Sequence, residues 1–81
     1  MSVGVRAIID INQMALGYKS SITLHVSNTK FIDVKSILGL SITLYRDHLY
    51  ILNIHGPDEE EARAAMLGVF HKHHLHVEVE D

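Results

Sequence analysis

Residues Ser20–Leu40 read SSITLHVSNTKFIDVKSILGL, and this stretch decides the fold. Apolar and polar side chains alternate over Ile22–Val26, which is typical of a strand with one buried face. Residues 27–29, Ser-Asn-Thr, favour a turn, and Lys30–Val34 predicts a returning strand, so the two strands form a hairpin. Ser36 then predicts a helix N-cap, because its hydroxyl can accept a hydrogen bond from a backbone N–H two or three residues further on.

Two more elements follow the short helix. Leu49–His55 is the most apolar segment, with Tyr50, Leu52 and Ile54 on one face, and it predicts the central strand. A polar connection at residues 45–48, Tyr-Arg-Asp-His, leads into it. The sequence GPDEEEA at residues 56–62 predicts the start of a long helix, because proline fits a first turn and carboxylates complement the positive end of the helix dipole. We expect the buried stripe of this helix at Ala62, Ala65, Met66, Val69 and Phe70.

The first segment, Val3–Leu16, fits two patterns. Alternation at Val3, Val5, Ala7, Ile9 and Ile11 fits a strand, whereas one side of a helix would carry Val5, Ile8, Ile9, Ile11, Ala15 and Leu16. Gly17 favours the helix, because it stands where a left-handed C-cap would be needed.

Composition restricts the class of protein. The chain has 81 residues, enough for one domain with a small core. A hydrophobic fraction of 47% and a charged fraction of 21% indicate a globular chain. The absence of cysteine excludes disulfides and thiol chemistry and fits a reducing cytoplasm. A net charge of −3 argues against a nucleic-acid partner, and no apolar run is long enough for a membrane span.

The order of these elements carries a resemblance to a known family. Strand, turn, strand, Lys35-Ser36-Ile37-Leu38-Gly39-Leu40, strand, glycine and acidic helix start together resemble the HPr-like phosphocarriers of the bacterial sugar phosphotransferase system. The resemblance implies a single α+β domain over residues 1–81, an open-faced sandwich with a small antiparallel or mixed sheet and helices on one face. It also supports a helix over Val3–Leu16, because the family has one there.

The chain departs from the family pattern in two places. The histidine that accepts the phosphoryl group in the family falls on Gly4, with Arg6 on the arginine two places later. No segment matches the family's first strand, which would leave one edge of Leu49–His55 unpaired. The resemblance therefore implies an HPr-like protein that lacks the transfer chemistry, a divergent member of the family.

The end of the chain adds a strand that the family pattern lacks. Leu75, Val77 and Val79 alternate with His76, Glu78 and Glu80, so one face of this strand should be buried. A crossover through the last helix would bring Leu75–Glu80 back parallel to Leu49–His55. The family's first strand would lie antiparallel in that place, so we expect a rearranged sheet.

The resemblance makes Ser36 a candidate site of regulatory phosphorylation, as in Gram-positive relatives. Lys35 is then a phosphate partner, and the apolar side chains that dock a protein partner are Ile37, Leu38 and Leu40. The alternative is that Ser36 only caps its helix while Ile37 and Leu40 fill the core.

Two further sites have plain alternatives. Arg6 near a helix start suits a phosphate anion, and it also fits a solvated arginine. The dense imidazoles of residues 71–81 suit zinc, nickel or copper, and they also fit a solvated tail; they are His71, His73, His74 and His76.

From these residues and the resemblance we expect a non-catalytic regulatory or docking protein of a bacterial cytoplasm, with no cofactor. Its partner would be a regulator of the phosphotransferase system or the HPr kinase, and a homodimer is a further expectation. Two other functions stay open: a small metal-binding protein that uses His71–His76, and a structural oligomer subunit without a ligand.

Overall fold

The computed structural model describes residues 3–27, 29–44 and 48–80. Their elements follow the chain in the order α1 (Val5–Leu16), β1 (Ser21–Ser27), β2 (Lys30–Asp33), α2 (Ile37–Thr43), β3 (Leu49–His55), α3 (Glu59–Lys72) and β4 (His76–Val79). The predicted turn residue Asn28 and the predicted polar connection at residues 45–47 lie outside the described part of the chain.

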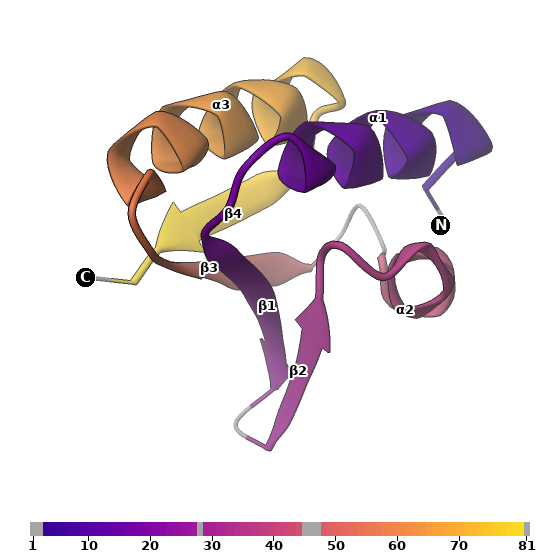
Figure 1. The fold of residues 1–81 in the computed structure, drawn as a ribbon. Helices are drawn as coiled ribbons and strands as arrows, with labels where there is room; N and C mark the ends of the chain where they lie inside the picture. The colour runs from indigo at the N-terminus through magenta and orange to yellow at the C-terminus, as the bar shows by residue number, and fades with distance from the viewer. Residues whose placement is uncertain (1–2, 28, 45–47, 81) are drawn as a thin grey trace.

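The strands form one mixed sheet in the order β2-β1-β3-β4. Strand β1 is antiparallel to β2 and to β3, and β4 runs parallel to β3, with Leu49 opposite His76 and Leu52 opposite Val79. Helices α1 and α3 lie side by side over one face of the sheet, and the opposite face is open (Figure 1). Helix α2 packs against α1 and β2. The prediction of an α+β open-faced sandwich is confirmed.

Strand β3 is central, as predicted, because it has a neighbour on each side. Its side chains Tyr50, Leu52 and Ile54 are buried beneath the helices, while Leu49 and His55 face solvent. This alternation follows from the two-residue period of a strand with one covered face. The Tyr50 hydroxyl donates a hydrogen bond of 2.8 Å to the Thr43 carbonyl oxygen, which ties α2 to the core.

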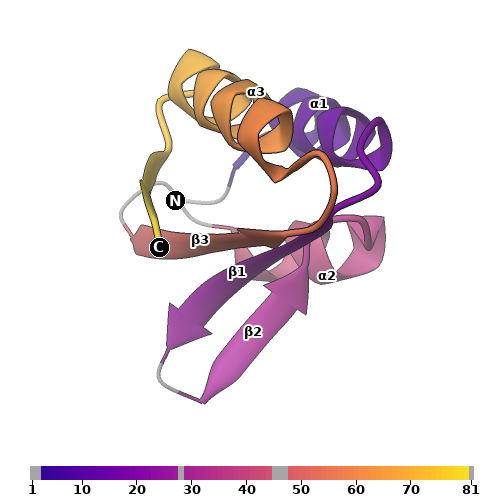
Figure 2. The same cartoon turned by 60° about the vertical axis from the view of Figure 1, so that its left-hand side comes forward.

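Strand β4 is also confirmed, including its parallel direction. Leu75 is almost fully buried, Val77 and Val79 pack partly against the core, and the alternate residues His76 and Glu78 are exposed. Figure 2 shows β4 at the margin of the sheet beside β3. Helix α3 is therefore the crossover between two parallel neighbours.

The N-terminal segment is a helix, so the strand alternative is wrong there. Its predicted apolar side needs a correction, because Val5, Ile9 and Leu16 are exposed. Helix α1 packs against both α2 and α3, and the buried residues that face the core are Ala7, Ile8, Ile11, Asn12 and Ala15. Gly17 has a φ of −76°, a right-handed value, so the prediction of a left-handed C-cap is also wrong.

A close contact joins the loop before α3 to the loop before β1. Gly56 has a φ of 151°, and a Cβ atom at Gly56 would lie 2.6 Å from the Cα atom of Ser20. The carboxylate of Asp58 accepts hydrogen bonds of 2.9 Å from the backbone N–H groups of Lys19 and Ser20, and one from the Ser20 hydroxyl. The acidic helix start is thus confirmed in Glu59–Glu61, whereas Asp58 binds a distant loop.

This contact gives a first prediction. Gly56→Ala should lower the free energy of unfolding by about 1–3 kcal/mol, because alanine is strained at this φ and its Cβ collides with the Ser20 backbone. Chemical denaturation of both proteins measures the change. Gly68→Ala is the matched control: its Cβ meets no atom within 4 Å, and alanine should raise helix stability by up to ~1 kcal/mol. Equal destabilisation of the two variants would contradict the argument.

Candidate functional site

The start of α2 presents Ser36 at the surface. Ser36 is the N-cap residue, and its Oγ accepts a hydrogen bond of 3.3 Å from the Gly39 N–H. The turn before it is held by Asp33, whose side chain accepts from the Lys35 N–H and whose carbonyl oxygen accepts from the Ser36 N–H, both at 2.9 Å. The predicted N-cap is therefore present, and the exposed hydroxyl has a fixed position.

Helix α2 also has an exposed apolar face. Ile37, Leu38 and Ile42 are 47%, 72% and 68% exposed, and we call them the α2 patch. Sequence reasoning missed Ile42, although it lies four positions after Leu38 and so shares its helix face. Leu40 is fully buried, which corrects the prediction that it docks a partner; Leu40 is instead part of the core.

Lys35 does not extend freely toward Ser36. Its Nζ donates a hydrogen bond of 2.7 Å to the carbonyl oxygen of Tyr18, which follows α1. The lysine therefore links the α2 turn to the end of α1. Binding a phosphate on Ser36 through this ammonium would first require that hydrogen bond to break.

Gly4 and Arg6 lie at the start of α1, and both are exposed. Gly4 is the N-cap residue in an extended conformation, with no side-chain cap, and a Cβ there would meet nothing within 4 Å. Glycine offers no nitrogen that could accept a phosphoryl group. Helix α1 packs against α2, so Gly4 and the Ser36 turn belong to the starts of neighbouring helices (Figure 1).

The four clustered histidines diverge in the structure. His71 is exposed in the last turn of α3, and His73 contacts Asp10 of α1. His74 has a φ of 60°, and His76 is exposed on β4. Within residues 3–27, 29–44 and 48–80, no three His, Asp or Glu side chains come together in a way that could hold a metal ion. The described residues therefore do not support the metal-binding alternative.

His73 has a structural contact instead. Its Nε2 donates a hydrogen bond of 2.9 Å to Asp10 Oδ2 on α1, and Lys72 Nζ lies 3.7 Å from the same oxygen. The hydrogen bond from His73 lowers the pKa of Asp10 below its ordinary value of 3.8, against an opposing contribution from desolvation, and the charges of Lys72, His73 and Arg6 lower it further. Asp10 therefore joins α1 to the end of α3.

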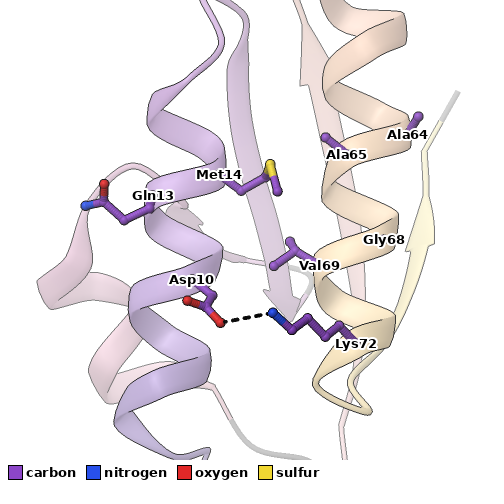
Figure 3. Close-up of a pocket in the computed structure, with 8 residues that line it drawn as sticks. All are labelled: Asp10, Gln13, Met14, Ala64, Ala65, Gly68, Val69 and Lys72. Atoms are coloured by element: carbon purple, nitrogen blue, oxygen red, sulfur yellow. Dashed lines mark ion pairs between the residues drawn. The ribbon is translucent and has the colours of Figure 1, made fainter.

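The same two helices border an apolar groove that the sequence did not reveal. Figure 3 shows Asp10 and Lys72 meeting at one end, with Met14 and Val69 between the helices. Small side chains on α3 leave the space, which has a volume of ≈ 540 Å³ and is lined by Asp10, Gln13, Met14, Ala64, Ala65, Gly68, Val69 and Lys72. The run Ala64-Ala65-x-x-Gly68 was the one sequence signal for it.

Comparison with solved structures defines the class of fold. The chain has the fold of the HPr-like phosphocarriers. Crh of Bacillus subtilis, a catabolite-repression protein described as a dimer with a swapped domain, matches with a TM-score of 0.76 and 23% identity over 91% of this chain and 84% of that one. An HPr dimer from Thermoanaerobacter tengcongensis matches with a TM-score of 0.76 and 27% identity over 85% of this chain and 79% of that one.

A further HPr structure from Thermoanaerobacter tengcongensis, HPr-C-His, gives a TM-score of 0.76 and 24% identity, with 91% of this chain and 83% of that chain covered. No family model matches the sequence, and no curated protein matches it. The resemblance to the HPr-like family is thus confirmed through the fold. Among the described residues, no helix is both long and apolar enough to cross a membrane.

The hydrogen bond and the ion pair of Asp10 give a second prediction. A carboxyl group with a lowered pKa stabilises the fold above its unfolded pKa, and that stability is lost as the pH falls through the folded value. The melting temperature of the wild-type protein should therefore fall when the pH is lowered below 3.8, the ordinary pKa of an aspartate. The melting temperature of Asp10→Asn should fall less steeply over the same pH range. Asp58, whose pKa is lowered mainly by the Ser20 hydroxyl, contributes in the same direction, so Asp58→Asn is the parallel variant. Identical acid profiles for wild type and both variants would contradict this assignment.

Proposed function

We propose that this protein is a non-catalytic, HPr-like regulatory protein of a bacterial cytoplasm that binds a protein partner through the α2 patch. The observation that carries the proposal is the pairing of an exposed serine hydroxyl with exposed apolar side chains on one short helix. Exposed apolar side chains that gather on one surface are typical of protein-binding sites. The HPr-like fold of the structural neighbours supports a partner related to the sugar phosphotransferase system.

Ser36 is the proposed point of regulation. Its hydroxyl is exposed and lies next in the chain to Ile37 of the α2 patch. A phosphate on this hydroxyl would add about −1.5 to −2 charges beside an apolar docking surface. The modification would therefore change which partner the α2 patch prefers, by favouring one that offers a cation next to an apolar pocket.

Carrier chemistry is not part of the proposal. The resemblance puts Gly4 where the family pattern has its phosphoryl-accepting histidine, and the glycine has no side-chain nitrogen that could take a phosphoryl group. The seven histidines of the chain lie elsewhere in its sequence, at positions 25, 48, 55, 71, 73, 74 and 76.

A third prediction follows for phosphotransfer. With phosphoenolpyruvate and the general enzyme of the phosphotransferase system, the wild-type protein should take up no phosphate, because Gly4 has no nucleophile. A true HPr in the same reaction is the positive control. An acid-labile phosphohistidine on this chain would show that one of its seven histidines carries phosphate, and the non-catalytic assignment would be wrong.

A fourth prediction tests Ser36 and the α2 patch together. An HPr kinase should phosphorylate the wild-type protein, and Ser36→Ala should abolish the label, whereas Ser41→Ala, which changes another exposed serine of α2, should keep it. Leu38→Asp should slow labelling at least about tenfold, as expected for an interface residue that fills a partner's pocket. Phe31→Asp, which is similarly exposed but lies on β2, should label normally.

Each outcome of this experiment has a distinct meaning. A wild-type protein that stays unlabelled beside a labelled HPr would leave Ser36 as a plain helix cap. Equal slowing by Leu38→Asp and Phe31→Asp would show that the α2 patch does not dock the kinase.

A further inference from the structure

Strand β4 ends the sheet with a row of outward-facing backbone groups. The Glu80 N–H donates to the Leu52 carbonyl oxygen at 2.9 Å, and Leu52 pairs with Val79 in the parallel ladder. In such a ladder alternate residues point their N–H and C=O groups to the same neighbour. Glu78 and Glu80 therefore bond to β3, while the backbone groups of Val77 and Val79 point away from the sheet. No other described strand lies on that side of β4.

The two faces of β4 carry different side chains, and on the polar face a histidine precedes a glutamate. On the open face of the sheet His76 comes first and Glu78 follows, and both are exposed. On the helix face Leu75, Val77 and Val79 are apolar. In a second copy of β4 related by a two-fold axis, the strand runs in the opposite direction, so glutamate comes where the first copy has histidine. An imidazole N–H can then face a carboxylate across the axis, and apolar side chains can meet on the opposite face.

The outward-facing backbone groups restrict the registers of such a pair. In an antiparallel pair about a two-fold axis, residues whose backbone groups point outward must lie opposite one another. Within β4 this condition is met when the axis passes through His76, Val77 or Glu78. An axis through Glu78 sets two carboxylates directly opposite, and an axis through His76 sets two imidazoles opposite. An axis through Val77 sets His76 opposite Glu78 of the second copy, twice. Two carboxylates directly across a pair of strands repel each other, whereas an imidazole N–H opposite a carboxylate can donate a hydrogen bond to it.

We propose that β4 pairs with β4 of a second copy of this chain, antiparallel and about a two-fold axis at Val77, so that two sheets become one. The Val77 N–H of each copy donates to the Val77 carbonyl oxygen of the other. The Val79 N–H donates to the Leu75 carbonyl oxygen of the other copy, which remains available because Phe70 takes only the Leu75 N–H. The partly exposed side chains of Val77 and Val79 gain apolar neighbours on the helix face.

The interface is small, which sets its strength. One short strand on each side buries much less than the roughly 1,200–2,000 Å² of a stable complex, so the dimer should be weak and dependent on concentration. Charged side chains on an edge strand normally discourage pairing. Here the facing carboxylates disfavour an axis through Glu78, and the two imidazole–carboxylate pairs favour the axis through Val77.

A proline substitution tests the backbone part of the proposal. In Val77→Pro the lost N–H is one that points away from β3, so the intramolecular sheet can form, because proline is tolerated where an edge N–H faces solvent. Sedimentation of the full chain over a range of concentrations should show a monomer–dimer equilibrium for wild type and monomer for Val77→Pro. Val77→Thr, which keeps the N–H, is the matched control and should dimerise.

Amide hydrogen exchange tests the same pairing at single residues, independently of the size of the assembly. The amides of Val77 and Val79 should exchange more slowly as the wild-type concentration rises, while the Glu78 amide, already bonded to β3, should change little. If Val77→Pro does not fold, these amides and the charge variants still decide the question.

Charge exchange tests the register. Glu78→Lys should weaken the dimer about tenfold, because His76 of one copy then faces a lysine of the other. The double variant H76E/E78K places a lysine ammonium opposite a carboxylate, with donor and acceptor exchanged between the two positions, and should recover the wild-type association. A wild-type chain that stays monomeric at every concentration, a dimer that persists in Val77→Pro, or a double variant as weak as Glu78→Lys would each overturn the proposal. A series of ever larger assemblies would likewise exclude the closed two-fold pair.

Discussion

The structure depends on the pairing of β3 with a strand on each side. This strand carries three buried side chains, Tyr50, Leu52 and Ile54, and its backbone groups alternate between β1 on one side and β4 on the other. An unpaired backbone group in such a strand would cost free energy wherever water is excluded, so both neighbours are needed. The antiparallel neighbour comes from the hairpin, and the parallel neighbour comes from the end of the chain.

The parallel pairing constrains the helix layer. Strand β4 can return parallel to β3 only through a connection that spans the length of the sheet, and α3 is that connection. Its buried side chains then lie over the sheet, and α1 packs beside it through Asp10 and His73. The Asp58 carboxylate fixes the opposite end of α3 to the start of β1. Helix α2 packs beside α1 and β2, with its other face uncovered.

Local patterns in the sequence predicted the features that depend on neighbouring residues. The strand periods, the Ser36 cap and the acidic start of α3 are set within a few positions, and they are confirmed. The parallel direction of β4 was also predictable, because a helix between two adjacent strands makes them parallel. The resemblance added support for the N-terminal helix, which is present as α1.

Apart from the C-cap at Gly17, the errors arose where a contact joins distant segments. Leu40 and Leu38 have the same side chain and stand two positions apart, yet one is buried and the other exposed, because α1 and β2 lie on one side of α2. His73 looked like a member of a histidine cluster, but its partner is Asp10, 63 positions away. Asp58 likewise binds a loop 38 positions before it. Periodicity within one segment contains no information about such partners.

The α2 patch and the outer edge of β4 lie at opposite ends of the sheet. Helix α2 packs against β2 at one edge, whereas β4 forms the other edge, with β1 and β3 between them. A protein bound at the α2 patch would therefore leave β4 uncovered, and pairing through β4 would leave both α2 patches exposed. Two linked patches bind a partner that itself has two sites more tightly than one patch does, because the second contact becomes intramolecular. A weak strand pairing could thus strengthen docking at α2 without any new contact to the partner.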